Sequence, residues 1–384
     1  MVLSVTSVAT AAGYVFLALS ACGAIYALGA TYALWRFLRR SQPPLKAPPS
    51  VTVLKPLHGD EPELYENLSS LCGQDYPGPT QVIMGARDAA DAALAVAERV
   101  RQNHPDLDIT LTADPAQHGT NRKISNLINM SGQATGEVIV ISDSDVRLPP
   151  CGLSRIVAAL QQPDAGLVHC LYRGRATASL WSELAAMDIN ARFAASVAVG
   201  EALGAHPCLG PTMALRADVL EKIGGLNILA DQLADDFVLG QAVRAAGLKI
   251  VSPSMVIDHV FPERTAREML VHELRWARTV RLVQPAGYAG SLITHFLPLA
   301  LIGAALTGFS PLGLEILIDL LVLRLAQAYV LSRMTGADRP RLWLIPLRDM
   351  LSLLVFVGAF LGDRVEWRGA RLKVDRDGAM ASSS

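Results

Sequence analysis

The sequence predicts an α/β fold in which a Rossmann-like, mostly parallel sheet forms the central domain and transmembrane helices lie at both ends of the chain. Strand-like and helix-like patterns alternate from residue 51 to residue 142, which is typical of a parallel sheet with helices on both faces. Long apolar runs flank this region. Each run is near the roughly 20 residues that cross a bilayer as a helix.

The composition agrees with a membrane protein and excludes some functions. Of the 384 residues, 51% are hydrophobic and 18% are charged, which is more apolar than an ordinary soluble protein. The formal net charge of −1 offers no basic face for nucleic acid. The five cysteines show neither CxxC nor zinc-site spacing, so we interpret them as buried or idle thiols in a reducing compartment.

Residues 1–40 are expected to form a retained membrane anchor. The run Val2–Leu34 lacks the basic start of a signal peptide and is longer than the apolar core of one. Arg36, Arg39 and Arg40 follow it, and the bias of basic residues toward the cytoplasm predicts that the next domain is cytosolic. The proline-rich residues 41–50 form a stiff linker.

The central domain, residues 51–285, begins with three alternating pairs of strand and helix. The strands are predicted at 51–59, 80–88 and 108–114, and the helices at 61–74, 92–104 and 121–135. A fourth strand follows in "GEVIVISDSDV", residues 136–146. Its β-branched residues predict a buried position in the sheet.

The second half of the domain is less regular. The predicted elements are a strand at 166–174, a long helix at 179–202, a turn, strand and helix within 208–225, a helix within 233–247, edge strands within 248–263 and a helix at 267–284. Asp235 and Asp236 fall in the first turn of the helix within 233–247. His272, Arg275 and Trp276 fall on the last helix, which is expected to reach the membrane.

The end of the fourth strand carries Asp143 and Asp145. Alternation along a strand points both side chains to the same side, and ligands of open α/β sheets bind beyond the carboxyl ends of the strands. Two adjacent carboxylates repel each other unless a cation lies between them. A divalent metal that carries phosphate oxygens is therefore the expected occupant.

The C-terminal region, residues 286–363, is expected to hold transmembrane or interfacial helices, followed by a basic tail at 364–384. Spans at 290–308, 311–332 and 343–361 would carry that tail outside, against the positive-inside bias. Either one run is re-entrant or interfacial, with the run around Arg348 and Asp349 the suspect, or the tail is an exception. Glu315, Asp319 and Arg324 pair within the bundle or face a lipid channel.

The order of motifs resembles the processive-type family 2 glycosyltransferases. It is most similar to the ceramide glucosyltransferase group of family 21 and to its bacterial relatives that glycosylate hopanoids. The motifs are "VLKPLHG", "ARDAAD", "NRKISNLINMSGQATGEVIVISDSDV", "GPTMALR", "LADDF" and "HELRW", followed by apolar helices. The resemblance covers nearly the whole chain and implies a GT-A fold.

The resemblance implies which residues bind a UDP-sugar. Asp88 matches the aspartate that reads uracil and ribose, and Lys55 lies where the family contacts the nucleotide. Lys123 matches the lysine set against the diphosphate, with Asn126 behind it. Asp143 and Asp145 match the acids that bind Mg²⁺ or Mn²⁺ and the diphosphate; some ceramide enzymes have Asp-Ser-Gly there, so this sequence favours metal dependence.

The resemblance also implies catalytic residues. Asp236 matches the general base, and Asp235 stands in place of the usual acidic neighbour. Arg275 and Trp276 match the signature Arg-Trp pair. His272 stands where many relatives have Gln, so its role as a substrate contact stays open.

Each assignment has a structural alternative. Asp235 and Asp236 could serve only the helix dipole, Lys123 could lie on a solvated face, and Arg275 and Trp276 could meet lipid headgroups. His259 could be a further metal ligand, although a lone His is more often a hydrogen-bonded structural residue. Gly210 and Pro211 are most simply a turn.

The predicted function is an inverting transfer of N-acetylglucosamine or glucose from a UDP-sugar to a hydroxyl of a membrane lipid. A hopanoid is favoured over ceramide because the sequence is Ala-rich and of bacterial appearance, which also favours the bacterial inner membrane. We expect no nucleic-acid partner and no obligate protein partner. The alternatives are a ceramide glucosyltransferase, a processive polysaccharide synthase, which usually has more helices after the catalytic domain, and an inactive nucleotide-sugar sensor.

Overall fold

The computed structural model describes residues 5–177, 179–362, 364–367, 370–374 and 380–382. The chain divides into two compact units. The sheet unit comprises Leu38–Thr177, Gly204–Pro262 and Leu372–Ser384, and the helical unit comprises Met1–Phe37, Ala178–Leu203 and Glu263–Arg371. Residues 178–203 and 263–285 therefore belong with the apolar helices, although the sequence groups them with the central domain.

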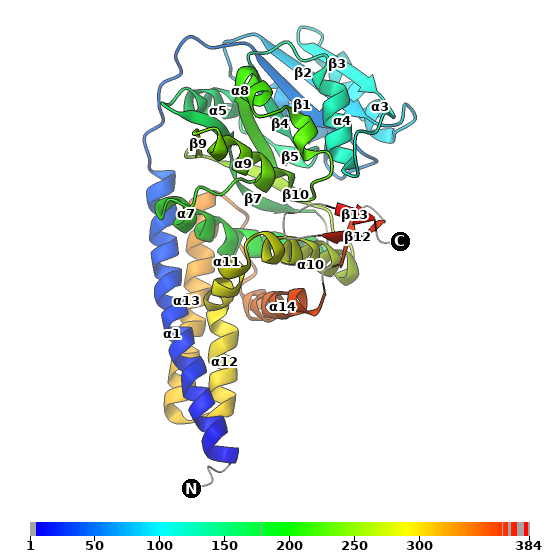
Figure 1. Cartoon of the computed structure of the whole chain (residues 1–384). Helices are drawn as coiled ribbons and strands as arrows, with labels where there is room; N and C mark the ends of the chain where they lie inside the picture. The colour runs from blue at the N-terminus through cyan, green and yellow to red at the C-terminus, as the bar shows by residue number, and fades with distance from the viewer. Residues whose placement is uncertain (1–4, 178, 363, 368–369, 375–379, 383–384) are drawn as a thin grey trace. The chain divides into compact units, whose positions relative to one another are not determined.

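A mixed, mostly parallel sheet forms the centre of the sheet unit (Figure 1). Its strands are β1 (Val51–Pro56), β2 (Thr80–Ala86), β3 (Asp108–Ala113), β4 (Val138–Ser142), β6 (Ala165–His169), β8 (Thr212–Arg216) and β9 (Lys249–Val251). The order is β3-β2-β1-β4-β8-β6-β9. Strands β3, β2, β1 and β4 are parallel, and β8 runs antiparallel to both of its neighbours.

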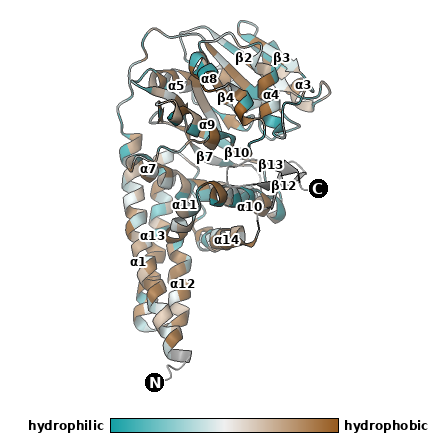
Figure 2. Cartoon of the chain, in the orientation of Figure 1, coloured by the Kyte–Doolittle hydropathy of each residue, from teal (hydrophilic) through white to brown (hydrophobic). Residues whose placement is uncertain are grey.

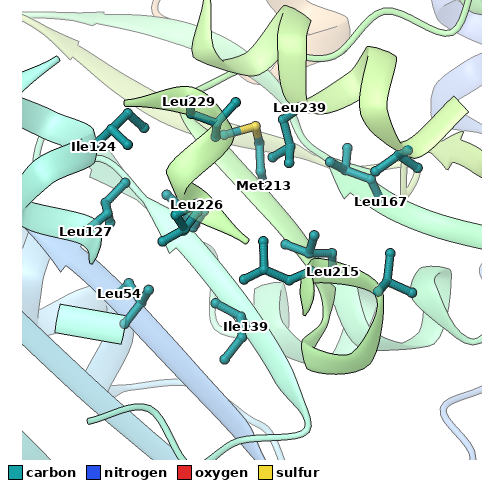
Figure 3. Close-up of a cluster of buried hydrophobic side chains, with 14 of the residues drawn as sticks. Leu54, Ile124, Leu127, Ile139, Leu167, Met213, Leu215, Leu226, Leu229 and Leu239 are labelled. Atoms are coloured by element: carbon teal, nitrogen blue, oxygen red, sulfur yellow. The ribbon is translucent and has the colours of Figure 1, made fainter. Parts of the chain in front are cut away.

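Helices cover this sheet and bury their apolar sides on it. They are α2 (Leu64–Cys72), α3 (Ala92–Asn103), α4 (Arg122–Ser131), α5 (Gly152–Leu160), α8 (Ala217–Lys222), the 3-10 helix η2 (Leu226–Leu229) and α9 (Asp235–Ala245). Ile124 and Leu127 of α4 lie with Leu54 of β1 in the buried cluster of Figure 3, to which Met130 of α4 also belongs. This packing fixes the start of α4 at the carboxyl edge of the sheet.

A second, three-stranded sheet has the order β5-β10-β7, formed by β5 (Val146–Arg147), β7 (Leu171–Ala176) and β10 (Val256–Phe261). Two sequence predictions were wrong here. Both strands within 248–263 were predicted at an edge. Strand β9 lies at an edge of the seven-stranded sheet, but β10 is the central strand of the second sheet, because β5 and β7 pair on its two sides. The predicted strand at 166–174 is two strands, β6 and β7, which join different sheets on either side of Cys170.

The helical unit contains most of the remaining elements. They are α1 (Val5–Leu38), α6 (Leu180–Asp188), the π-helix η1 (Ile189–Phe193), α7 (Ala194–Ala202), α10 (Ala266–Val283), α11 (Pro285–Gly290), η3 (Ser291–His295), α12 (Phe296–Leu306), α13 (Pro311–Thr335), η4 (Leu342–Leu344), α14 (Ile345–Gly358) and η5 (Ala359–Leu361). Within this unit α1, α12 and α13 run alongside one another, while α14 runs across their direction (Figure 1).

Three helical segments are long and apolar enough to cross a membrane among the residues that the structure describes: Ser7–Leu38, Pro285–Leu306 and Leu342–Leu361. They indicate an integral membrane protein, and their apolar character is visible in Figure 2. The predicted run at 311–332 lies on α13, which carries Glu315, Asp319 and Arg324 and is not among the three.

The predicted basic tail, residues 364–384, is described only in part. Residues 368–369, 375–379 and 383–384 lie outside the described residues. The remaining residues form β11 (Arg364–Trp367), β12 (Ala370–Val374) and β13 (Met380–Ser382), and β12 and β13 pair antiparallel.

Candidate functional site

Asp143, Ser144 and Asp145 form a tight turn between β4 and β5. The amide of Val146 donates to the carbonyl of Asp143 at 3.2 Å, which closes the turn. The amide of Asp143 donates to the carbonyl of Pro211 at 3.0 Å, and the amide of Val260 donates to that of Asp145 at 2.8 Å. The turn is thus fixed by three backbone hydrogen bonds, and it holds two carboxylates at the carboxyl end of the central strand.

Lys123 links two of the predicted acids. Its Nζ lies 2.7 Å from Asp143 Oδ1 and 3.5 Å from Asp235 Oδ2. The Asn121 side chain caps α4 by accepting from the amides of Lys123 and Ile124, which places the lysine in the first turn of that helix. Burial alone would lower the pKa of Lys123, but Asp143 and Asp235 raise it above its usual value. The lysine is therefore a fixed positive charge beside both acids.

Asp236 follows Asp235 in the first turn of α9 and has a different environment. Its Oδ1 accepts from the amide of Phe237 at 2.7 Å. Burial, followed by the charge of Asp235, raises the pKa of Asp236 to about 7. Gly210 lies against this carboxyl, since a Cβ at Gly210 would stand 3.3 Å from Asp236 Oδ2. A carboxyl with this pKa can accept a proton near neutral pH.

Asp145 has a partner that sequence reasoning set aside as structural. His259 Nε2, from β10, lies 3.1 Å from Asp145 Oδ2. Burial alone would raise the pKa of Asp145, but His259 and the nearby lysines lower it to about 2. The sequence placed His259 in a predicted edge strand, and only the pairing of β10 with β5 shows which acid it meets.

The turn can hold a divalent cation. The Oδ1 atom of Asp145 is buried and accepts no hydrogen bond from the described residues. Within the same residues, no group of three or more His, Cys, Asp or Glu side chains is placed to hold a metal ion. Mg²⁺ typically takes one or two protein carboxylates and completes its shell with water and substrate phosphates. Asp143 and Asp145 fit that incomplete ligand set.

Lys55 was expected to contact the nucleotide, but its side chain contacts the protein interior. Its side chain is fully buried, and its Nζ donates to Ser142 Oγ at 3.3 Å, to the carbonyl of Val146 at 3.0 Å and to the carbonyl of Asp143. These contacts use the three donors of an ammonium group. Burial lowers the pKa of Lys55 to about 8. The buried lysine therefore braces the acidic turn by donating hydrogen bonds to its backbone carbonyls.

This bracing gives a testable expectation. In Lys55→Met two buried carbonyls lose a donor, at a cost of about 1–3 kcal/mol each. We expect a lower free energy of unfolding and weaker UDP binding, measured by thermal unfolding and by titration calorimetry. Lys222→Met, at an exposed position of α8, is the matched control. Wild-type UDP affinity in a folded Lys55→Met variant would contradict the bracing role.

Asn126 and Asp88 lie at the same edge of the sheet but in different settings. Asn126 is buried, and its Nδ2 donates to the carbonyl of Gly85 at 2.8 Å, which ties α4 to the end of β2. Asp88 is exposed in the loop after β2, where its Oδ1 accepts from the amide of Ala90 at 2.9 Å. Strand β1 separates β2 from β4. Asp88 is thus free of the acidic cluster and open to a ligand.

His272, Arg275 and Trp276 lie on α10 in the helical unit. His272 Nδ1 lies 2.6 Å from Oε1 of Glu263, a buried acid. The rings of His272 and Trp276 meet edge to face with centroids 4.3 Å apart. Sequence reasoning missed Glu263, which orients His272. Nothing in the mixed polar and apolar stretch before α10 distinguishes Glu263 from its neighbours.

Comparison with known proteins gives concordant findings. The profile of Glycosyl transferase family 21 matches residues 15–380. Ceramide glucosyltransferase 1 of Caenorhabditis elegans is 23% identical over 248 residues, which cover 62% of this chain and 52% of that protein. Ceramide glucosyltransferase 3 of the same organism is 22% identical over 388 residues, which cover 95% of this chain and 81% of that protein. The match thus spans about half of the first relative's length.

A solved structure has the same fold. It is the mannosyltransferase PcManGT of Pyrobaculum calidifontis in complex with GDP-Man and Mn²⁺. The two chains are 22% identical and superpose with a TM-score of 0.54 over 91% of this chain and 98% of that chain. This likeness confirms the predicted α/β fold of GT-A type with a mostly parallel sheet.

Proposed function

Because the chain belongs to glycosyl transferase family 21, we propose that it moves a glucose or N-acetylglucosamine residue from a UDP-sugar to a hydroxyl of a membrane lipid. The observation that carries the proposal is the cluster at the carboxyl edge of the sheet. Lys123 lies between Asp143 and Asp235, and the pKa of neighbouring Asp236 is raised to about 7 by burial and by Asp235. The cluster thus combines anchoring charges with a group that can take up a proton.

The donor half of the reaction needs groups that stabilise the departing UDP. Lys123 supplies a positive charge for the diphosphate, and Asp88 is open to the uracil and ribose. Mg²⁺ or Mn²⁺ held by Asp143 and Asp145 would supply further neutralisation of the leaving group when bound. A mannosyltransferase of the same fold carries Mn²⁺.

The acceptor half needs a base. Asp236 is the proposed base, because its carboxylate would take the proton of the lipid hydroxyl as the new bond forms. A single base without an enzyme nucleophile implies direct displacement and therefore inversion at the anomeric carbon. Arg275 and Trp276 are proposed as further contacts of the reacting groups, as the Arg-Trp motif of the family implies.

The lipid acceptor is supported by the three apolar helical segments and by the ceramide glucosyltransferases to which the chain is similar. Their names support a ceramide-like acceptor. The hopanoid, the cytosolic orientation of the sheet unit and the bacterial inner membrane remain predictions from the sequence.

Lipid analysis tests the proposal most directly. We expect expression in a host that lacks this enzyme to produce a new glycolipid, whose sugar and lipid are identified by mass spectrometry. Purified protein with UDP-glucose or UDP-N-acetylglucosamine should release UDP only when the matching lipid is added. Tight binding of a UDP-sugar with no transfer to any hopanoid, ceramide or diacylglycerol would instead support the sensor alternative.

A further inference from the structure

The helical unit contains a network of six buried or half-buried charged side chains that the proposed chemistry does not use. Its members, called here the charge network, are Asp188, Arg192, Glu273, Arg324, Arg348 and Asp349. They come from α6, η1, α10, α13 and α14. The three acids balance the three arginines in formal charge, so the network as a whole is neutral.

Arg348 of α14 makes the contacts that join two helices. It is 1% exposed. Its Nη1 and Nη2 each donate to one oxygen of Glu273 on α10 at 2.8 Å, and Nη2 also lies 3.5 Å from Asp188 Oδ1. A guanidinium that meets a carboxylate through two parallel hydrogen bonds fixes distance and orientation together. The pair therefore sets how α10 is rotated against α14.

The rest of the network holds α14 itself in place. Arg324 of α13 donates to both oxygens of Asp349 at 2.7 and 2.8 Å and to the carbonyl of Ala191 in η1 at 2.9 Å. Ser352, one turn after Arg348, donates to Asp188 Oδ1 at 2.8 Å. These contacts fix α14 against α13 and α6, so that Arg348 meets Glu273 from a fixed position.

The outer face of α14 and its flanking turns is apolar. Trp343, Leu347, Leu354 and Leu361 are 71%, 48%, 63% and 81% exposed. Their spacing of four, seven and seven residues places them on one side of a helix, opposite Arg348 and Ser352. A helix that buries its charges and exposes its apolar side has the pattern of a helix in contact with lipid. Figure 1 shows α14 running across α1, α12 and α13.

Glu273 lies inside the "HELRW" motif, two residues before Arg275. Two residues turn an α-helix by about 200°, so Glu273 and Arg275 point to nearly opposite sides of α10. Fixing the carboxylate of Glu273 therefore fixes the side of α10 from which the Arg275 side chain projects. His272 and Trp276, one turn apart, share a third side, which agrees with their ring contact at 4.3 Å.

Leu342–Leu361 is long and apolar enough to cross a membrane, but α14 runs across the direction of α1, α12 and α13. We propose that α14 lies along the membrane surface and positions the Arg-Trp motif of α10, with Arg348 as the positioning residue that acts through Glu273. The inference rests on the proposed function, because that function gives Arg275 and Trp276 a part in the reaction. Arg348 has no direct part in the proposed reaction, because its guanidinium contacts Glu273, Asp188 and Ser352. A misplacement of about 1 Å in a reacting group can cost about 10²-fold in rate.

The test uses the full-length protein in lipid nanodiscs with Arg348→Met, Arg348→Lys and Glu273→Gln. Arg341→Met is the matched control, because Arg341 precedes η4 and its side chain is 60% exposed. We expect Arg348→Met to lower kcat about 10²-fold with the KM for the UDP-sugar changed less than twofold. Arg348→Lys should recover part of kcat, because lysine keeps the positive charge but cannot donate the two parallel hydrogen bonds of the guanidinium.

Hydrogen exchange along Ala266–Val283 supplies a readout that needs no turnover. Faster exchange confined to this helix in Arg348→Met and Glu273→Gln, with Arg341→Met like the wild type, would support the anchoring even if no lipid is ever glycosylated. If Arg348→Met does not fold, hydrogen exchange in the isosteric variant Glu273→Gln tests the anchoring of α10 by itself. Unchanged exchange on α10, or an equal loss of UDP-sugar binding and kcat, would overturn the positioning role.

Discussion

Replacing Asp236 by Asn is expected to lower kcat by about 10² to 10⁴, the contribution of a positioned general base. The substitution keeps the size of the side chain and its ability to accept from the amide of Phe237, so α9 keeps its first turn. It removes the negative charge of the carboxylate and with it the capacity to take a proton. UDP-sugar affinity, measured by calorimetry, should stay within about threefold, because donor binding is assigned to other residues.

The pH dependence gives an independent check of the same residue. Burial and Asp235 raise the pKa of Asp236 to about 7, above its usual value near 3.8. Only the deprotonated form can act as a base, so kcat/KM should be lost as pH falls through 7 and should level off above it. In Asp236→Asn this inflection should disappear.

Asp218→Asn is a suitable control, because that aspartate lies on the surface of α8 with its side chain 74% exposed. It should leave kcat and its pH profile at the wild-type level. If Asp236→Asn keeps more than about a tenth of wild-type turnover while still binding UDP-sugar, the base is another group.

The second large effect is expected for Asp145→Asn. Removing this charge leaves His259 without its carboxylate and removes one of the two acids that fit a divalent cation. Loss of the metal's charge neutralisation, worth several kcal/mol, would lower kcat on the order of 10²- to 10³-fold. Wild-type protein treated with EDTA should fall to a similar rate and recover with Mn²⁺ or Mg²⁺, whereas the variant should recover little.

The metal assignment has a readout apart from activity. Mn²⁺ binding in the presence of UDP, followed by electron paramagnetic resonance, should weaken at least tenfold in Asp145→Asn. Asp164→Asn, at an exposed ion pair with Lys249, serves as the control. Turnover that survives both EDTA and Asp145→Asn would remove the cation from the mechanism.

Local patterns in the sequence were sufficient to predict the first half of the sheet. Each of β1, β2 and β3 is followed by an amphipathic helix, and short-range spacing alone identifies both the strand and the helix. The pattern failed at "GLVHCLYRG", because this mostly apolar run carries no sign that the chain changes from one sheet to the other at Cys170. It failed again at β10, because the partners on its two sides, β5 and β7, are distant in sequence.

The candidate site shows the same division. The strand end that carries Asp143 and Asp145 and the first turn that carries Asp236 could be found from the sequence. The orientation of a long side chain could not. Lys55 was assigned to the nucleotide from its place at a strand end, but its four-carbon chain reaches the carbonyls of the acidic turn. His259 and Arg348 likewise depend on contacts across more than 70 residues.

The two compact units alternate along the chain, with changes near residues 38, 178, 204, 263 and 372. During synthesis neither unit is complete when the other begins, so each has to wait for segments that leave the ribosome later. A soluble fragment cut at residues 51 and 285 would expose Asp188, Arg192 and Glu273 without Arg324 and Arg348. Biochemical work on the isolated sheet unit would therefore require a redesigned connection between residues 177 and 204.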